Sequence, residues 1–212
     1  MIVLICIALG IALRLLSGRR LSEIGSVGLR GEMALIVLLA AQLALPSVRL
    51  AGAERIGYYA WLGTFPCIIV IAWANRRAPG MAMLGLGLLL NFAVIASNGG
   101  MPVFSSAALI AKPGLLALTL PTGDFVHVVG TVSTRLPWLG DVIPIPGPSW
   151  LRSVASAGDL LLFAGIVVFL GAARGHAGEG RAVDQTGIAS VSGNSLAAAG
   201  SGSQPDKMEC SR

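Results

Sequence analysis

The sequence contains little charge for its length of 212 residues. Asp, Glu, Lys and Arg make up 12% of the chain, hydrophobic residues make up 55%, and the mean hydropathy is +0.80. A soluble domain usually carries about 25% charged residues. The shortage of charge argues against an ordinary soluble domain and favours several membrane spans, each of which needs roughly 20 apolar residues.

Site motifs are equally scarce. The chain has three cysteines, and an odd number at these spacings is neither a disulfide framework nor a zinc site. It also lacks a nucleophile elbow and a His-Glu-x-x-His pattern. The sequence therefore predicts no cofactor and no metal. The net charge is +5, but no basic cluster is interleaved with aromatics, so membrane lipids are predicted as partners and nucleic acid is not.

Five apolar runs dominate the chain. The first begins without the positive segment that precedes the apolar stretch of a signal peptide, so an uncleaved helix is predicted. Pro66 lies near the middle of the third run and predicts a kink. The five transmembrane helices are predicted at residues 1–16, 33–48, 56–74, 79–97 and 154–173.

The predicted fold is an all-α integral membrane helix bundle over residues 1–173. Residues 98–152 form a long, partly apolar loop between the fourth and fifth helices. Residues 174–212 are rich in glycine, alanine, serine and small polar residues. Because this composition cannot build a core, a disordered tail is predicted there.

The orientation follows from the basic residues. Positive charge gathers beside the first and third loops and at the start of the tail, and the positive-inside rule assigns these segments to the cytoplasm. The N-terminus and the 98–152 loop are then outside, in the cytoplasmic membrane of a bacterium. Arg14 ends the first helix and is predicted to snorkel to the cytoplasmic interface. The basic residues used here are Arg14, Arg19, Arg20, Arg30, Arg76, Arg77, Arg174 and Arg181.

Two polar residues lie within or beside predicted helices. Asn91 is near the middle of the fourth helix, where it either lines a substrate path or hydrogen-bonds to another helix. Gly87 lies one turn earlier on the same face, which predicts a close-packed helix interface there. Asp159 follows Ser156 at the spacing of a capping box, and ion or proton handling is its alternative role.

The outer loop is too apolar to be disordered. Residues 104–111 predict a short helix lying on the membrane, and residues 115–120 predict a re-entrant or interfacial segment. Residues 134–148 contain four prolines, so a regular helix or a central strand is excluded. We expect an extended, stiff lid over the bundle. Within it, Arg135 and Asp141 either pair with each other or hold a charged ligand.

Several segments together are similar to a known family. They are residues 18–21, 91–103, 134–146 and 154–159, of which the Asn-Gly-Gly-Met-Pro and Leu-Gly-Asp-Val-Ile-Pro stretches are the most specific. The chain resembles, over roughly residues 1–173, a bacterial multi-pass family catalogued as domain of unknown function 5317. The resemblance implies the membrane architecture and implies no chemistry, because the family brings no assigned activity.

Three classes of function fit the sequence. The favoured class is a ligand- or lipid-binding or scaffold module that uses the outer loop. Its expected partners are membrane lipids, another membrane protein or a second copy of itself. The alternative is a small transporter or an accessory subunit of one. A membrane-embedded enzyme using Asp124 and His127 is the least favoured, because no second ligand pair or nucleophile accompanies them. The candidate binding residues are Asn91, Asn98, Arg135, Asp141 and Asp159.

Overall fold

The computed structural model describes residues 2–47, 54–112 and 125–173. The predicted tail, the predicted re-entrant segment and Asp124 lie outside these residues. The helices and strands, in chain order, are α1 (Ile2–Leu16), α2 (Ser22–Gly25), α3 (Glu32–Ala44), the 3-10 helix η1 (Leu45–Ser47), α4 (Glu54–Ala74), α5 (Met81–Asn98), β1 (Met101–Val103), α6 (Ser105–Ala111), β2 (His127–Val129), the 3-10 helix η2 (Pro137–Leu139), β3 (Ile143–Ile145), β4 (Ser153–Ala155) and α7 (Ala157–Ala172).

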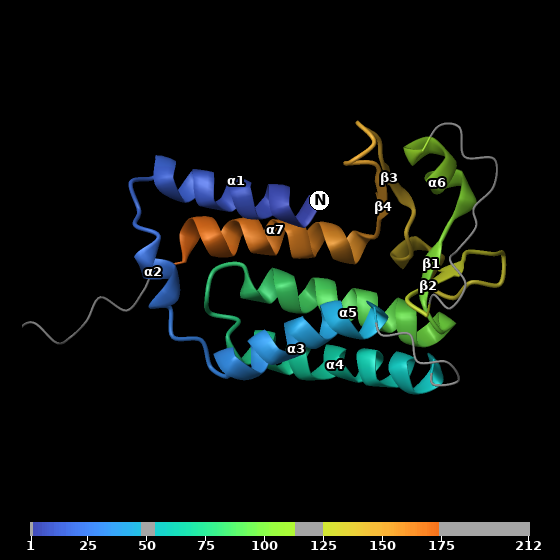
Figure 1. Cartoon of the computed structure of the whole chain (residues 1–212), viewed down its shortest axis with the longest axis horizontal. Helices are drawn as coiled ribbons and strands as arrows, with labels where there is room; N and C mark the ends of the chain where they lie inside the picture. Colours follow the sequence, from blue (N-terminus) through green and yellow to red (C-terminus); the bar gives the residue numbers. More distant parts are fainter. Residues whose placement is uncertain (1, 48–53, 113–124, 174–212) are drawn as a thin grey trace, which may run out of the picture. The chain divides into compact units, whose positions relative to one another are not determined.

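Five apolar helices pack side by side in the part of the chain that the structure describes. α1 contacts α7, α7 contacts α5, α5 contacts α4, and α4 contacts α3. Figure 1 shows α1 and α7 running in one direction and α5 running in the other. The loops before α3 and before α5 therefore meet at one end of the bundle, and the strands lie at the other end, which we call the cap. The sequence-based helix positions agree with these elements to within a few residues.

Two helix ends differ from the prediction for identifiable reasons. α3 stops at Ala44 and continues as η1, because Pro46 has no N–H to donate to the preceding turn. α7 begins at Ala157 because residues 153–155 form strand β4. The capping box predicted there is confirmed, since the Ser156 side chain accepts from the Asp159 N–H and the Asp159 side chain accepts from the Ser156 N–H.

The core lies where α4 and α5 meet the cap. Trp61, Phe65, Val94 and Ile95 are buried there together with Met101 of β1. The rings of Trp61 and Phe65 meet edge to face with their centroids 5.1 Å apart, a favoured aromatic geometry. This cluster joins the helices to the first strand of the cap.

The cap corrects the expectation of an all-α chain. β1 pairs with β2 in parallel, and β3 pairs with β4 in antiparallel. Pro102 and Pro144 lie within β1 and β3, which is possible because every strand of a two-stranded sheet is an edge strand. The short helix predicted at residues 104–111 is confirmed as α6.

Helix length separates the five apolar helices. α4 and α5 are long and apolar enough to cross a membrane. Over the most apolar 18 residues of each helix, 28% of the residues are buried in α4 and 33% in α5. The core helix of a soluble protein, in contrast, is mostly buried. α1, α3 and α7 have 13 to 16 residues, which corresponds to about 20–24 Å of helix.

Candidate functional site

Asn91, predicted to pack at a helix interface, joins α5 to the start of α7. Its side-chain N–H donates to Asp159 Oδ1 at 2.8 Å, and its Oδ1 accepts from the Ser156 hydroxyl at 3.0 Å. Asp159 Oδ2 accepts from the Ser156 N–H at 3.0 Å. The predicted close packing is also present, because a Cβ on Gly87 would lie 2.6 Å from the carbonyl oxygen of Gly158.

Asp141 lies beside this junction in the cap. Its N–H donates to the carbonyl of Pro102 at 2.8 Å, and its own carbonyl accepts from Phe104 at 3.3 Å, so two backbone bonds hold it beside β1. The residue is 7% exposed, and its Oδ1 is buried without a hydrogen-bond partner among the described residues. Buried polar atoms are nearly always satisfied, so this oxygen requires an explanation.

Burial raises the pKa of the Asp141 carboxyl from 3.8 to about 7, and the Asp159 carboxylate adds to the rise. Desolvation disfavours the charged form, and a second carboxylate disfavours it further. The structure therefore brings together three of the residues singled out from the sequence, Asn91, Asp141 and Asp159. We call these three residues with Ser156 the carboxylate cluster.

The Asn98 side chain contacts the backbone of Arg135, within the proline-rich segment 134–148. The Asn98 side chain donates to the Arg135 carbonyl at 2.9 Å and accepts from the Arg135 N–H at 2.8 Å. Asn98 thus fixes the backbone of Arg135 to the end of α5. Within the described residues no ion pair joins Arg135 to Asp141, because the backbone of Asp141 is held beside β1 while that of Arg135 is held beside α5.

A cavity of about 280 Å³ opens next to the carboxylate cluster. It lies between the start of α1, residues 150–155 and the first turns of α7. Asp159 contributes a carboxylate to its lining, and Trp150 and Phe163 contribute aromatic rings. Arg152 and Ser153 line it as well, so the cavity offers side chains of both charges beside its apolar ones. A few polar groups placed among apolar and aromatic side chains are typical of ligand pockets.

The remaining predicted pair is Asp124 with His127, and the structure describes only one of the two residues. His127 lies in β2, in register with Met101 of β1. Asp124 lies outside the described residues, so the structure gives no geometry for an Asp–His pair. In the part of the chain that is described, no group of three metal-ligating side chains is present.

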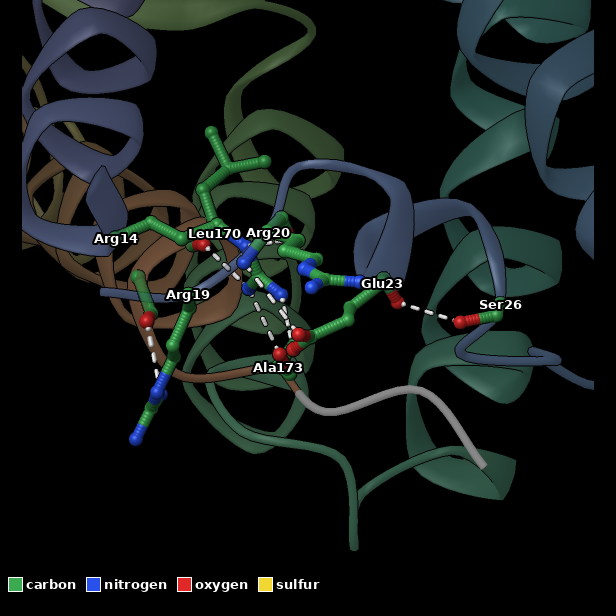
Figure 2. Close-up of polar contacts among 8 residues, drawn as sticks. Arg14, Arg19, Arg20, Glu23, Ser26, Leu170 and Ala173 are labelled. Atoms are coloured by element: carbon green, nitrogen blue, oxygen red, sulfur yellow. Dashed lines mark hydrogen bonds and ion pairs between the residues drawn. The ribbon is translucent and has the colours of Figure 1, made fainter. Parts of the chain in front are cut away.

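Arg14 is the residue that sequence reasoning assigned wrongly. It was expected to snorkel, but it is fully buried with 0% exposure. Its guanidinium donates to the carbonyls of Leu170 at 3.1 Å, Ala173 at 2.8 Å and Arg20 at 2.9 Å, and pairs with Glu23 at 3.0 Å. Figure 2 shows this group between the end of α7 and Glu23. The free carbonyls of a helix C-terminus attract a cation, and this attraction explains the burial.

Comparison with known proteins identifies the family of the chain. Residues 26–171, more than half of the sequence, match a family described as a family of unknown function (DUF5317). The chain belongs to this family. An uncharacterized protein of Thermotoga maritima is 35% identical over 96 residues, which are 45% of this chain and 52% of that protein. The chain thus spans about half the length of this relative. No solved structure matches.

The DUF5317 match confirms the resemblance stated from the sequence. The matched region contains all four residues of the carboxylate cluster and ends before α7 does. It leaves out α1, so Arg14 lies outside it. The family carries no assigned activity, and the chemistry of the site must therefore come from its geometry.

The raised pKa of Asp141 predicts a pH-dependent stability. Between about pH 4 and pH 7 the unfolded chain ionises Asp141 while the folded chain keeps the proton. The folded state then binds more protons, so the free energy of unfolding falls as pH rises through this window, by up to about 4 kcal/mol. Asp141→Asn is expected to remove this fall in denaturant unfolding measured across the pH range.

Glu32→Gln is the control for this prediction. Glu32 is exposed at the start of α3, away from the cap, and its replacement is expected to keep the wild-type pH profile. Parallel stability profiles for the wild type and Asp141→Asn would contradict the assignment.

Proposed function

We propose that the chain is an integral membrane protein whose cap binds a small ligand or lipid through the carboxylate cluster. Membrane insertion is supported by the apolar side chains that all five long helices leave exposed, among them Leu4, Leu43, Val70, Leu89 and Val168. Large apolar side chains exposed on every long helix suit a hydrocarbon environment better than water. The three shorter helices fit a bilayer that thins locally.

The five spans and the orientation belong to the same proposal. The arginines of the first and third loops lie at the end of the bundle away from the cap. By the positive-inside rule this end faces the cytoplasm and the cap faces outward. The cytoplasmic membrane of a bacterium is the setting that this assignment supports.

The buried Oδ1 of Asp141 carries the proposal for the cap. An unpaired acceptor in a dry site is costly, and a bound hydrogen-bond donor would remove that cost. Asp159 favours a cationic donor further once Asp141 has lost its proton, above a pH of about 7, because the two carboxylates then repel each other. We therefore propose a ligand that carries an amine or another strong donor. Asp159 is the member of the carboxylate cluster that lines the neighbouring cavity, and the rest of the ligand would meet Trp150 and Phe163 there, with Arg152 as a second charged contact.

A transport role is the second candidate, and the same pKa favours it. A carboxyl group with a pKa of about 7 exchanges its proton at neutral pH. Proton relays in transporters use such groups. The chain would then act as a small proton-linked carrier or as an accessory subunit of one.

Native mass spectrometry of the full chain in native lipid discs tests the cap proposal. The wild type is expected to retain a stoichiometric small-molecule or lipid adduct, and Asp141→Asn is expected to lose it, because the amide changes the acceptor without changing size. Glu32→Gln should keep the adduct. A bare wild-type chain, or an adduct that Asp141→Asn keeps, would contradict the proposal.

Two other outcomes point to the alternatives. A co-purified protein in place of a small adduct would favour the scaffold role. Proton flux into vesicles that carry the wild type, with none for Asp141→Asn, would favour transport.

A further inference from the structure

The end of the bundle away from the cap contains the larger cavity, with a volume of about 880 Å³. One wall comes from the segment between α1 and α3, at residue 19 and residues 27–30. A second wall comes from residues 74–79 between α4 and α5, and Ala172 at the end of α7 completes the lining. This volume lies within the range of small-molecule and cofactor sites.

The lining of this cavity carries charge of one sign. Its charged residues are Arg19, Arg30, Arg76 and Arg77, and none of the described lining residues is acidic. The acidic side chains nearby in sequence are Glu23 and Glu32. Glu23 is already paired with Arg14, and Glu32 lies in the first turn of α3 without lining the cavity. The four guanidinium groups are therefore not neutralised within the site.

Two of the four arginines are held in place. Arg19 donates to the carbonyl of Gly171 at 3.0 Å. Arg76 donates to the carbonyl of Trp73 at 3.1 Å, and its guanidinium lies 5.2 Å from the centroid of the indole ring. The side chains of Arg30 and Arg77 are exposed and make no hydrogen bond or ion pair with other described residues. The site thus combines two oriented cations with two that can still close on a ligand.

Asn75 joins the two walls. This residue is 8% exposed, and its side chain accepts from the Arg30 N–H at 2.8 Å and donates to the Arg30 carbonyl at 2.9 Å. The same amide donates to the carbonyl of Ile71 at 2.8 Å, at the end of α4. Asn75 therefore fixes the backbone of Arg30 beside the turn that carries Arg76 and Arg77.

The positive-inside rule accounts for basic residues at this end of the bundle. It requires only that charge lie near the ends of the spans, and it requires no common geometry. Arg20 illustrates the difference, because it is exposed at the same end and does not line the cavity. The convergence of four arginines from separate segments on one cavity, with a buried amide fixing its walls, is a feature of a built site.

We propose that this cavity binds a phosphate-bearing anion. The planar guanidinium group matches two phosphate oxygens at once, and the pairing of these charges gives short, strong hydrogen bonds. The ligand is either the headgroup of an anionic lipid in the adjacent leaflet or a soluble phosphate compound. Basic pockets between helices on the cytoplasmic side of membrane proteins suit lipid headgroups of this kind. The site is independent of the carboxylate cluster and of its function.

The lipid arm of the test uses the full chain in discs of phosphatidylcholine with added cardiolipin or phosphatidylglycerol. Native mass spectrometry measures the lipid that the protein retains. We expect the wild type to retain the anionic lipid, and the double variant Arg30→Gln/Arg77→Gln to weaken retention by about tenfold or more. Arg20→Gln is the matched control, because it removes charge at the same end without touching the cavity.

The soluble arm uses discs of phosphatidylcholine alone, with inorganic phosphate and pyrophosphate as probes in titration calorimetry. Binding that the double variant loses and Arg20→Gln keeps would assign the cavity to a soluble phosphate compound. Retention of anionic lipid with the same dependence, without binding of either probe, would assign it to a headgroup.

Two outcomes would overturn the proposal. One is that neither the lipids nor the inorganic probes bind the wild type. The other is that Arg20→Gln weakens binding as much as the double variant, because diffuse charge would then explain it. Both variants replace exposed side chains, so their unfolding midpoints are expected to match the wild type, and this measurement shows that any loss of binding is local.

Discussion

Replacing Arg14 with methionine is expected to lower the free energy of unfolding by about 3 kcal/mol. Methionine keeps the length and apolar stem of the side chain but removes every donor. The carbonyls of Leu170, Ala173 and Arg20 then lose a charged partner at the end of α7. Each buried carbonyl left unsatisfied costs about 1–3 kcal/mol, and water that enters the helix end recovers part of the sum.

Glu23 contributes less to this loss. Its side chain is 40% exposed, so solvent can stabilise its charge once Arg14 is gone. The expected effect therefore arises mainly at the C-terminus of α7. Arg14→Lys is expected to recover part of the stability, because an ammonium keeps the charge beside the helix end but cannot span all four acceptors.

Arg20→Met is the control in the same segment. The Arg20 side chain is exposed and only its backbone enters the network, so the expected change is within about 0.5 kcal/mol. Denaturant unfolding of the three variants in detergent provides the comparison. Equal stabilities for Arg14→Met and Arg20→Met would contradict the role assigned to the buried guanidinium.

Arg14 also shows where sequence reasoning stops. Two of its acceptors lie 156 and 159 residues away in the chain, and both are backbone carbonyls, which any residue type provides. The sequence therefore contains no sign of the pairing. An arginine at the end of an apolar run is typical of an interfacial residue, and only the packing of α1 on α7 makes it a buried helix cap.

The helices and some of their contacts can be predicted from the sequence. Apolar runs located the five long helices, and the spacing of Ser156 and Asp159 predicted the capping box. Gly87 with Asn91 predicted a close-packed helix interface, and the structure identifies α7 as the partner helix. These signals are local or follow helical periodicity. The strands of the cap have three residues each, too few to show an alternating pattern. Asp141 is held beside β1, and the Asp159 carboxylate of α7 adds to the rise of its pKa, so this pKa could not be inferred from residues 134–148 alone.

Gly80→Ala is expected to destabilise the chain by about 3 kcal/mol or more, through two separate effects. The residue begins α5 with a φ of 79°, which disfavours any side chain. A Cβ there would also overlap the carbonyl oxygen of Gly165 in α7 and lie 2.8 Å from the backbone nitrogen of Phe169. Both obstacles are backbone atoms of another helix, which no change of rotamer can move.

Two other glycines separate these effects. Gly99 has a φ of 74° and open space around it, so Gly99→Ala measures the backbone strain alone, about 1 kcal/mol. Gly63 lies inside α4 with open space and no positive φ, so Gly63→Ala is expected to stabilise the chain by about 0.5–1 kcal/mol. The excess loss in Gly80→Ala over Gly99→Ala then measures the packing of α5 on α7.

The size of this excess matters for both proposed sites. Pro79, immediately before Gly80, lines the cavity that contains the four arginines. The hydrogen bond between Asn91 and Asp159 also joins α5 to α7. A forced separation of the two helices would therefore be expected to disturb the cavity at one end and the carboxylate cluster at the other. If Gly80→Ala cost no more than Gly99→Ala, the helices would be free to move apart at this point, and the close approach would not be what positions either site.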